Sequence, residues 1–245
     1  MSKNIIFFLI VLLANAVEVV AGFGSVILAI TFGAYFFSLQ QLVPVLVPLN
    51  FFLGVILIYK YHREINFKKL LNRILIGTGL GMPIGIYLFN TAPNEIIKPL
   101  LGVLVFLLAS YELWNSSRPS RSTKPLSPLQ AWVFLFLGGI VQGLYASGGP
   151  LVVYYSVREF EHKSELRSTL AALWLVLNFI LIVSLVGSGK INSESLKWSG
   201  YLTPAIVLGF FIGDKIHHRV SERAFRMSVY ILLLLAGAGL FLSKN

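Results

Sequence analysis

The chain has 245 residues, of which 56% are hydrophobic and only 12% are charged, and its mean hydropathy is +0.80. Soluble domains are about 45–50% apolar and about 25% charged, so this composition excludes an ordinary soluble protein and predicts an integral membrane protein. The net charge of +10 does not indicate a nucleic-acid partner, because the basic residues stand in short loops rather than in a stripe with aromatic residues. The absence of cysteine from this sequence excludes disulfides, thiolate metal sites and cysteine nucleophiles.

The apolar segments divide the chain into two halves. All of them are predicted to be helices, because a lipid-exposed strand edge or loop would leave backbone groups without hydrogen bonds. Simple counting gives seven to eight hydrophobic helices and an all-α polytopic membrane fold. The polar, basic stretch at 115–128, NSSRPSRSTKPLSP, is the clear linker between residues 1–114 and 129–245. In chain order the segments are 4–37, 41–59, 70–89, 96–114, 129–157, 168–189, 198–213 and 226–243.

The two halves are predicted to be repeats of one another, with four hydrophobic segments each. GMPIG at 81–85 matches GFFIG at 209–213 with an offset of 128 residues, and Asn50 matches Asn178 at the same offset. Leucine-rich segments resemble one another by chance, but glycines and asparagines paired at one offset favour a duplication.

The first segment of each half is predicted to be a broken or re-entrant helix pair. VEVVAGFGS at 17–25 matches VQGLYASGG at 141–149, and the nearly charge-free stretches around them, 4–37 and 126–157, each exceed 30 residues, whereas one membrane span needs about 20. The chain start, MSKNIIFFLIVLLANA, has the outline of a secretory signal. We expect it to be retained, because the segment that it opens has a counterpart in the second half.

Hairpins at these two places would also distribute the basic residues more unequally between the two sides of the membrane than eight full crossings would. They put 15 of the 20 Lys and Arg residues on one side of the membrane, as the positive-inside rule favours. Three crossings per half would then invert the second repeat relative to the first, an arrangement common in transporters. The basic loops concerned are 60–73, 118–124, 158–167 and 215–226.

The two breaks are predicted to form a substrate site. Pro150 suits the first turn of a new helix, Ser25 suits an N-cap, and a helix N-terminus favours anions. Two such ends would hold a small anion without a fixed cation, although glycines also serve plain close packing of membrane helices. The predicted substrate-binding residues at the breaks are Gly22, Phe23, Gly24, Ser25, Ser147, Gly148, Gly149 and Pro150.

Five further polar or aromatic positions are candidates. Asn50 and Asn178 could donate to the substrate or hydrogen-bond each other between helices, and Trp174, one turn before Asn178, could wall the site or pack in the core. Glu18 is an intramembrane carboxylate that could carry a coupling proton or could pair with a backbone N–H. Its counterpart in the second half is Gln142, so the charge is not symmetric. Arg167 could attract anions or simply anchor its helix.

DKIHH at 214–218 has the composition of a metal cluster, but we expect it in a solvated basic loop without a metal. The sequence also contains no set of nucleophile, base and acid and no phosphate-cradling loop. It therefore predicts neither an enzyme nor a bound cofactor.

The chain resembles the sulfite exporter (TauE/SafE) family over nearly its whole length. The first half carries AGFGSVILAI (21–30), Pro44, Pro48 and GLGMPIGIYLF (79–89), but has GFGS where many members have a triple-glycine run. The second half carries the more characteristic stretches, GGIVQGLYASGGPLVVYY (138–155) and LRSTLAALWLVLN (166–178).

This resemblance implies a secondary transporter that moves sulfite, sulfoacetate, another sulfonate or a related small organic anion across the cytoplasmic membrane. An anion channel, a membrane enzyme and an accessory subunit are the alternatives. A proton or sodium ion for coupling and a homodimer are left open, as are the particular anion and the direction of transport.

Overall fold

The computed structural model describes residues 3–33, 35–91, 103, 106–107, 110, 113–114, 125–146 and 148–242. The described part of the chain is built from helices and contains no strand, and six of its helices are long and apolar enough to cross a membrane. The predicted all-α polytopic fold class is therefore confirmed. The six candidate spans are Lys3–Ala21, Gln40–Glu64, Phe67–Thr91, Pro128–Tyr145, Lys163–Gly187 and Ser193–Arg219.

The helices of the first half follow the predicted apolar segments closely, and most of the segment 96–114 lies outside the described residues. The long segment at 4–37 is divided into two helices, and Ser38 caps the next helix together with Gln41. The elements are α1 (Lys3–Ala21), α2 (Ser25–Gly33), α3 (Leu39–Tyr61), the 3-10 turn η1 (His62–Glu64), α4 (Phe67–Lys69), the π-helical turn η2 (Leu70–Ile74) and α5 (Leu75–Thr91).

The second half repeats this order of a long helix, a short helix and further long helices. Ser127 caps its first helix with Gln130, and Pro128 occupies the first helical position, where a missing N–H costs nothing. The elements are α7 (Pro128–Tyr145), α8 (Gly149–Glu159), α9 (Lys163–Gly187), α10 (Ser193–Arg219) and α11 (Glu222–Leu242).

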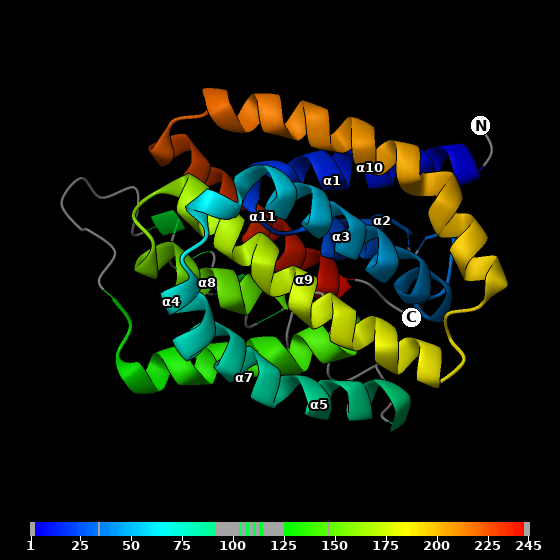
Figure 1. Ribbon diagram of the computed structural model, residues 1–245, viewed down its shortest axis with the longest axis horizontal. Helices are drawn as coiled ribbons and strands as arrows, with labels where there is room; N and C mark the ends of the chain where they lie inside the picture. Colours follow the sequence, from blue (N-terminus) through cyan, green and yellow to red (C-terminus); the bar gives the residue numbers. More distant parts are fainter. Residues whose placement is uncertain are drawn as a thin grey trace.

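The two short helices that follow the breaks lie in the core. Residues 149–157 of α8 are all buried, and most of α2 is buried as well. A helix that is apolar and buried on every side belongs inside a bundle. In Figure 1, α1 enters from the right and α7 enters from the left, so the two helix pairs start from opposite ends of the molecule.

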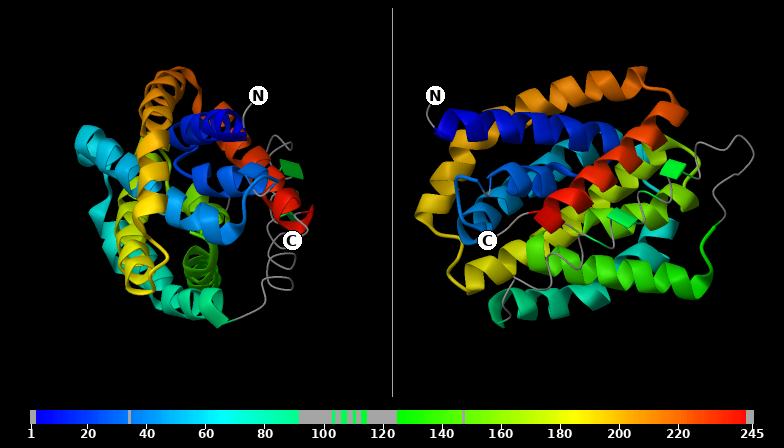
Figure 2. Two further views of the ribbon diagram at one scale, coloured as in Figure 1. Left: turned by 90° about the vertical axis from the view of Figure 1, so that its right-hand side faces the viewer. Right: turned by 180° about the vertical axis from the view of Figure 1, so that it is seen from behind.

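Matched glycines let helices of one half pack closely on helices of the other. On α10, a Cβ added at Gly213 would lie 2.4 Å from the carbonyl oxygen of Ala16 on α1, and Figure 2 shows these two helices side by side. On α5, a Cβ added at Gly85 would lie 2.0 Å from the carbonyl oxygen of Ile140 on α7. The stretches GMPIG and GFFIG therefore have the same packing role, while the repeat and the division into 1–114 and 129–245 stay predictions.

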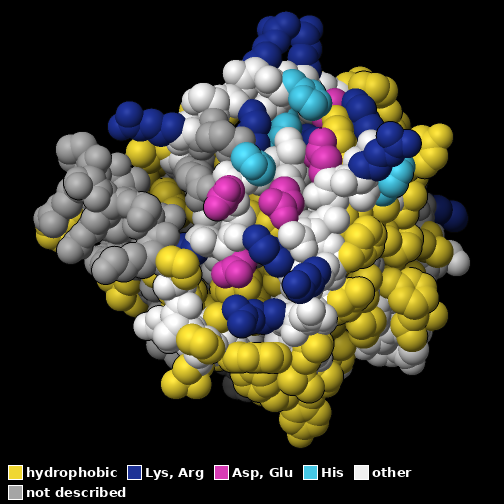
Figure 3. Space-filling view, turned by 60° about the vertical axis from the view of Figure 1, so that its left-hand side comes forward, with side chains coloured by type: hydrophobic (Ala, Val, Ile, Leu, Met, Phe, Trp, Pro, Cys, Tyr) yellow, Lys and Arg dark blue, Asp and Glu magenta, His cyan; other side chains and the backbone are white. Residues whose placement is uncertain are grey.

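Charged side chains gather at one end of the molecule (Figure 3), where hydrophobic side chains cover the flanks. This end carries the described loops at 62–66, 160–162 and 220–221, on the left of Figure 1. We call it the charged end. The fourth basic loop, 118–124, lies outside the described residues.

Candidate functional site

The first break turns the chain with two glycines in backbone conformations that other residues rarely adopt. Gly22 has φ +84° and Gly24 has φ +111°, and only glycine takes such angles without steric cost. The N–H of Gly22 donates to the carbonyl oxygen of Glu18 at 2.6 Å and closes α1. The helix α2 then begins at Ser25.

The second break uses its glycines differently. Ala146 takes the left-handed conformation, with φ +51°, at the end of α7, while Gly148 has an ordinary φ of −63°. Gly148 is needed for space, because a Cβ there would lie 2.3 Å from the carbonyl oxygen of Gly138. Pro150 stands in the first turn of α8, as predicted, and Ser147 lies outside the described residues.

A carboxylate occupies the start of α2. Glu18 is buried, and its Oε2 accepts from the backbone N–H of Ser25 at 2.9 Å. The amide nitrogen of Asn50 donates to both Glu18 oxygens, at 2.8 and 2.9 Å, and lies 2.8 Å from the Ser25 hydroxyl. The sequence predicts Ser25 as the N-cap of α2, whereas the helix begins at Ser25 itself and the Ser25 hydroxyl accepts from Asn50.

The second half repeats this arrangement with a neutral side chain. The Oε1 of Gln142 accepts from the backbone N–H of Gly148 at 2.9 Å, and its Nε2 donates to Oδ1 of Asn178 at 3.0 Å. Gln142 was recognised from the sequence as the counterpart of Glu18, but it was not predicted to be part of the site. The match between 17–25 and 141–149 was the signal that could have included it.

The two halves are joined where the paired asparagines meet. The Nδ2 of Asn178 donates to Oδ1 of Asn50 at 2.6 Å, which makes one chain of hydrogen bonds that runs from Gln142 through Asn178 and Asn50 to Glu18. Every amide in this chain donates towards Glu18, so the carboxylate is its final acceptor. Both asparagines are buried.

A small cavity lies between the two breaks. It has a volume of about 20 Å³, which is room for about one water molecule. The ring of Phe23 reaches across it, since a Cβ at Gly149 would lie 3.0 Å from Cδ2 of Phe23. Its lining is Glu18, Phe23, Gly24, Val26, Ile27, Asn50, Gln142, Ala146, Gly149, Pro150 and Trp174.

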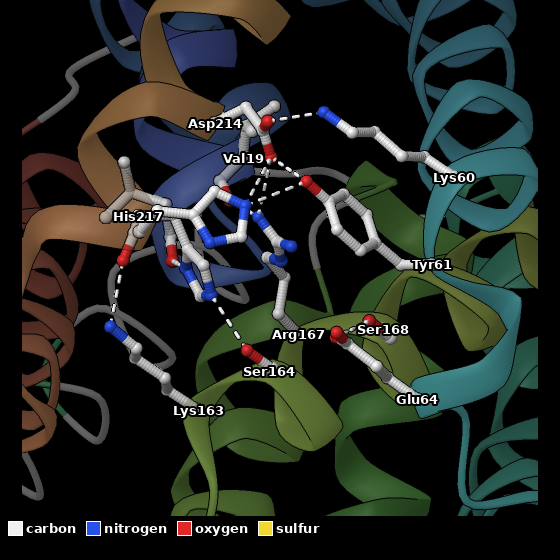
Figure 4. A network of polar contacts seen from close by, with 12 residues as sticks. Val19, Lys60, Tyr61, Glu64, Lys163, Ser164, Arg167, Ser168, Asp214 and His217 are labelled. Atoms are coloured by element: carbon white, nitrogen blue, oxygen red, sulfur yellow. Dashed lines mark hydrogen bonds and ion pairs between the residues drawn. The ribbon is translucent and has the colours of Figure 1, made fainter.

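Seven of the residues predicted from the sequence therefore line one cavity, and others adjoin it through contacts. Gly22 accepts from Nε1 of Trp174 at 2.9 Å through its carbonyl oxygen. Gly148, Ser25 and Asn178 are connected to the lining by the hydrogen bonds described above. Arg167 is buried in a second polar cluster, nearer the charged end (Figure 4).

The second cluster corrects the prediction for DKIHH. Asp214 and His217 are buried residues of α10, not members of a solvated loop. Asp214 pairs with Lys60 of α3 at 2.7 Å and accepts from the hydroxyl of Tyr61. These partners lie more than 150 residues away in the chain, so local charge density could not reveal the burial. Among the described residues, no group of three or more His, Asp or Glu side chains could hold a metal ion.

Comparison with known proteins agrees with this architecture. A model of the sulfite exporter TauE/SafE family matches residues 7–240. The probable inner membrane transporter protein TsaS of Comamonas testosteroni is 26% identical over 189 residues, which cover 73% of this chain and 76% of TsaS. No solved structure matches the chain.

The apolar helices and these matches define a multi-pass transport protein of the cell membrane rather than an enzyme. The chain belongs to the sulfite exporter TauE/SafE family.

Proposed function

We propose that the protein is a secondary transporter of a small sulfur-containing or related organic anion, such as sulfite, sulfoacetate or another sulfonate. The anion binds between the two breaks, and one half rocks against the other to expose it to each side in turn. The observation that carries this proposal is that the first turns of α2 and α8, one from each half, face the same cavity.

The electrostatics of the cavity favour an anion that arrives with a proton. The first N–H groups of a helix have no acceptor within the helix, and together they carry about half a positive charge. The ionised Glu18 carboxylate opposes a second negative charge, at a cost of about 4 kcal/mol for charges ~4 Å apart at an effective dielectric constant of 20. Protonation of Glu18 removes this cost, so a proton is the coupling ion that the site supports best.

Closed ends on both sides of the cavity support alternating access over a channel. At the charged end, Asp214 ties α10 to α3 through Lys60 and Tyr61. At the opposite end, Phe37 packs on Phe7 and Trp198 with ring centroids 5.2 and 4.8 Å apart. A pocket of about 360 Å³ opens above these aromatic rings and shares no lining residue with the small cavity.

Reconstitution in liposomes tests the function. Uptake of sulfite, sulfoacetate, other sulfonates and carboxylates is measured, and a carrier is expected to saturate and to show counterflow. Non-saturating anion current would indicate a channel, and no flux of any of these anions would refute the proposal.

Gly149→Leu tests the place of binding. The new side chain would enter the space held by Phe23 and the cavity, so we expect uptake to fall to background while the protein still inserts and purifies normally. The matched control is Gly187→Leu, because a Cβ at Gly187 has nothing within 4 Å. Normal uptake by Gly149→Leu would show that the anion binds elsewhere.

The orientation in the membrane is tested by single cysteines, which can be introduced into this cysteine-free chain. We expect a cysteine at Ser38 to react with an impermeant thiol reagent from outside and one at Glu161 from inside. The same accessibility for both would rule out the proposed inverted topology.

A further inference from the structure

Arg167 is a completely buried cation, and only one of its three guanidinium nitrogens forms hydrogen bonds with the described residues. It extends from α9 towards α1 and α10 beside the ring of Tyr61 (Figure 4), with Cζ 4.1 Å from the ring centroid. Its Nη1 lies 3.3 Å from Oδ1 of Asp214 and 3.3 Å from the carbonyl oxygen of Val19. Both contacts are longer than the usual distance for a charged hydrogen bond.

The opposite edge of the same guanidinium has no acceptor. Neither Nε nor Nη2 of Arg167 forms a hydrogen bond with any residue that the structure describes. These two N–H groups point in parallel and form the edge with which arginine binds two oxygens of one oxyanion. A buried charge with unpaired donors is unfavourable, so the geometry is suited to a partner that comes from outside the chain.

The charge around Arg167 also favours an anion. Asp214 is the acid in direct contact with it, and that carboxylate is also bound by Lys60 at 2.7 Å and by the hydroxyl of Tyr61. His218 contributes an Nε2 only 3.8 Å from Asp214. Two permanent cations therefore share one carboxylate, which leaves a net positive charge in the cluster.

Arg167 stands between the cavity and the charged end. A Cβ at Gly22 would lie 3.1 Å from Cα of Arg167, so the arginine packs directly against the first break. Trp174, which lines the cavity, follows seven residues later on α9, or about 10 Å further along the helix. An anion that moves from the cavity to the charged end would thus pass Arg167.

We propose that the Nε and Nη2 edge of Arg167 is a second anion subsite, which binds a small oxyanion such as a carboxylate, sulfite or sulfonate through two of its oxygens. The subsite lies on the charged-end side of the cavity and receives the anion when that end opens. This inference rests on the proposed function, because it concerns the same substrate on the same route.

The test is calorimetric titration of the purified protein in detergent with sodium sulfite and sodium sulfoacetate. Arg167→Lys keeps the charge but loses the paired donors, so we expect Kd to rise at least tenfold. Asp214→Asn keeps the shape and removes the competing negative charge, so we expect Kd to fall several-fold. Arg63→Lys, an exposed change at the same end, is expected to leave Kd unchanged.

The tighter anion binding expected for Asp214→Asn distinguishes an anion subsite at Arg167 from a merely structural role of this arginine, since a damaged fold would not tighten binding. This variant also decides the matter if Arg167→Lys does not fold. An unchanged Kd in both variants, with saturable uptake by the wild-type protein, would overturn the subsite and leave the proposed function standing. Absence of both binding and uptake in the wild-type protein would overturn the two together.

Discussion

The two breaks have the same architecture but different chemistry. In the first, glycines with positive φ turn the chain and a carboxylate, Glu18, accepts the first N–H of α2. In the second, a left-handed alanine turns the chain and a neutral amide, Gln142, accepts the N–H of Gly148. The single charge of Glu18 is therefore enough to orient the whole chain of hydrogen bonds that runs between the two breaks.

The orientation follows from counting donors and acceptors. An amide side chain offers both a donor and an acceptor, whereas an ionised carboxylate only accepts. Gln142, Asn178 and Asn50 form a row of three amides, and a backbone N–H group donates at each end of the hydrogen-bonded chain. Such a chain needs, at one end, a side chain that accepts hydrogen bonds and donates none. Glu18 provides it, and Asn50 and Asn178 can therefore point the same way.

Moving the charge to the other break is the change with the largest expected effect. Gln142→Glu alone would bury a second carboxylate without a cation, at a cost of roughly 3–5 kcal/mol, and Oδ1 of Asn178 would face that carboxylate without the donor that Gln142 provides. Glu18→Gln alone would leave one amide donor without an acceptor, at a cost of about 1–3 kcal/mol. Thermal unfolding in detergent measures both losses.

The double variant provides the control, because it restores one carboxylate and reverses the chain. We expect Glu18→Gln with Gln142→Glu to be more stable than the sum of the single changes by about 1–3 kcal/mol. If the two changes were simply additive, the hydrogen-bonded chain would not couple the halves.

In liposomes, pH-dependent uphill transport by Glu18→Gln would contradict proton coupling through Glu18.

The glycines provide the next test, since the two breaks need them for different reasons. Gly148→Ala places a methyl group against the carbonyl oxygen of Gly138, and such overpacking costs roughly 1–3 kcal/mol or more. Gly24→Ala meets only Val17 at 3.9 Å but must keep φ at +111°, which costs about 1–3 kcal/mol in backbone strain.

Replacement by D-alanine in semisynthetic protein separates these two causes. A D-residue adopts positive φ without strain, so we expect D-alanine at Gly24 to recover the stability that Gly24→Ala loses. At Gly148, where φ is −63°, D-alanine exchanges the clash for an unfavourable backbone conformation, so we expect no recovery there. Equal tolerance at both positions, measured by thermal unfolding, would contradict the distinction.

Sequence reasoning located both breaks because the stretches at 17–25 and 141–149 match and each lies in an apolar segment too long for one span. Glycine and proline alone would not have marked them, since GMPIG lies within the unbroken helix α5. It also paired Asn50 with Asn178 through a constant offset, and the structure brings them to 2.6 Å. It could not choose between the roles of Glu18, because the acceptor for the N–H of Ser25 depends on how the chain folds back over seven residues. The burial of Asp214 depends on Lys60, 154 residues away, and no local pattern encodes that contact.

The smallest expected effect concerns the contact that ties the first break to the second half. Trp174 donates to the carbonyl oxygen of Gly22 at 2.9 Å. Trp174→Phe keeps an aromatic wall of the cavity and removes one neutral hydrogen bond, so we expect a loss of about 0.5–1.5 kcal/mol in stability.

Because a looser first break also loosens the cavity, the affinity for the transported anion should fall together with stability, while the maximal rate changes little. The uptake KM in liposomes measures this, with Trp132→Phe at a partly exposed position as the control. A tenfold or greater fall in maximal rate for Trp174→Phe would mean that the indole N–H acts on the moving anion itself and not through Gly22.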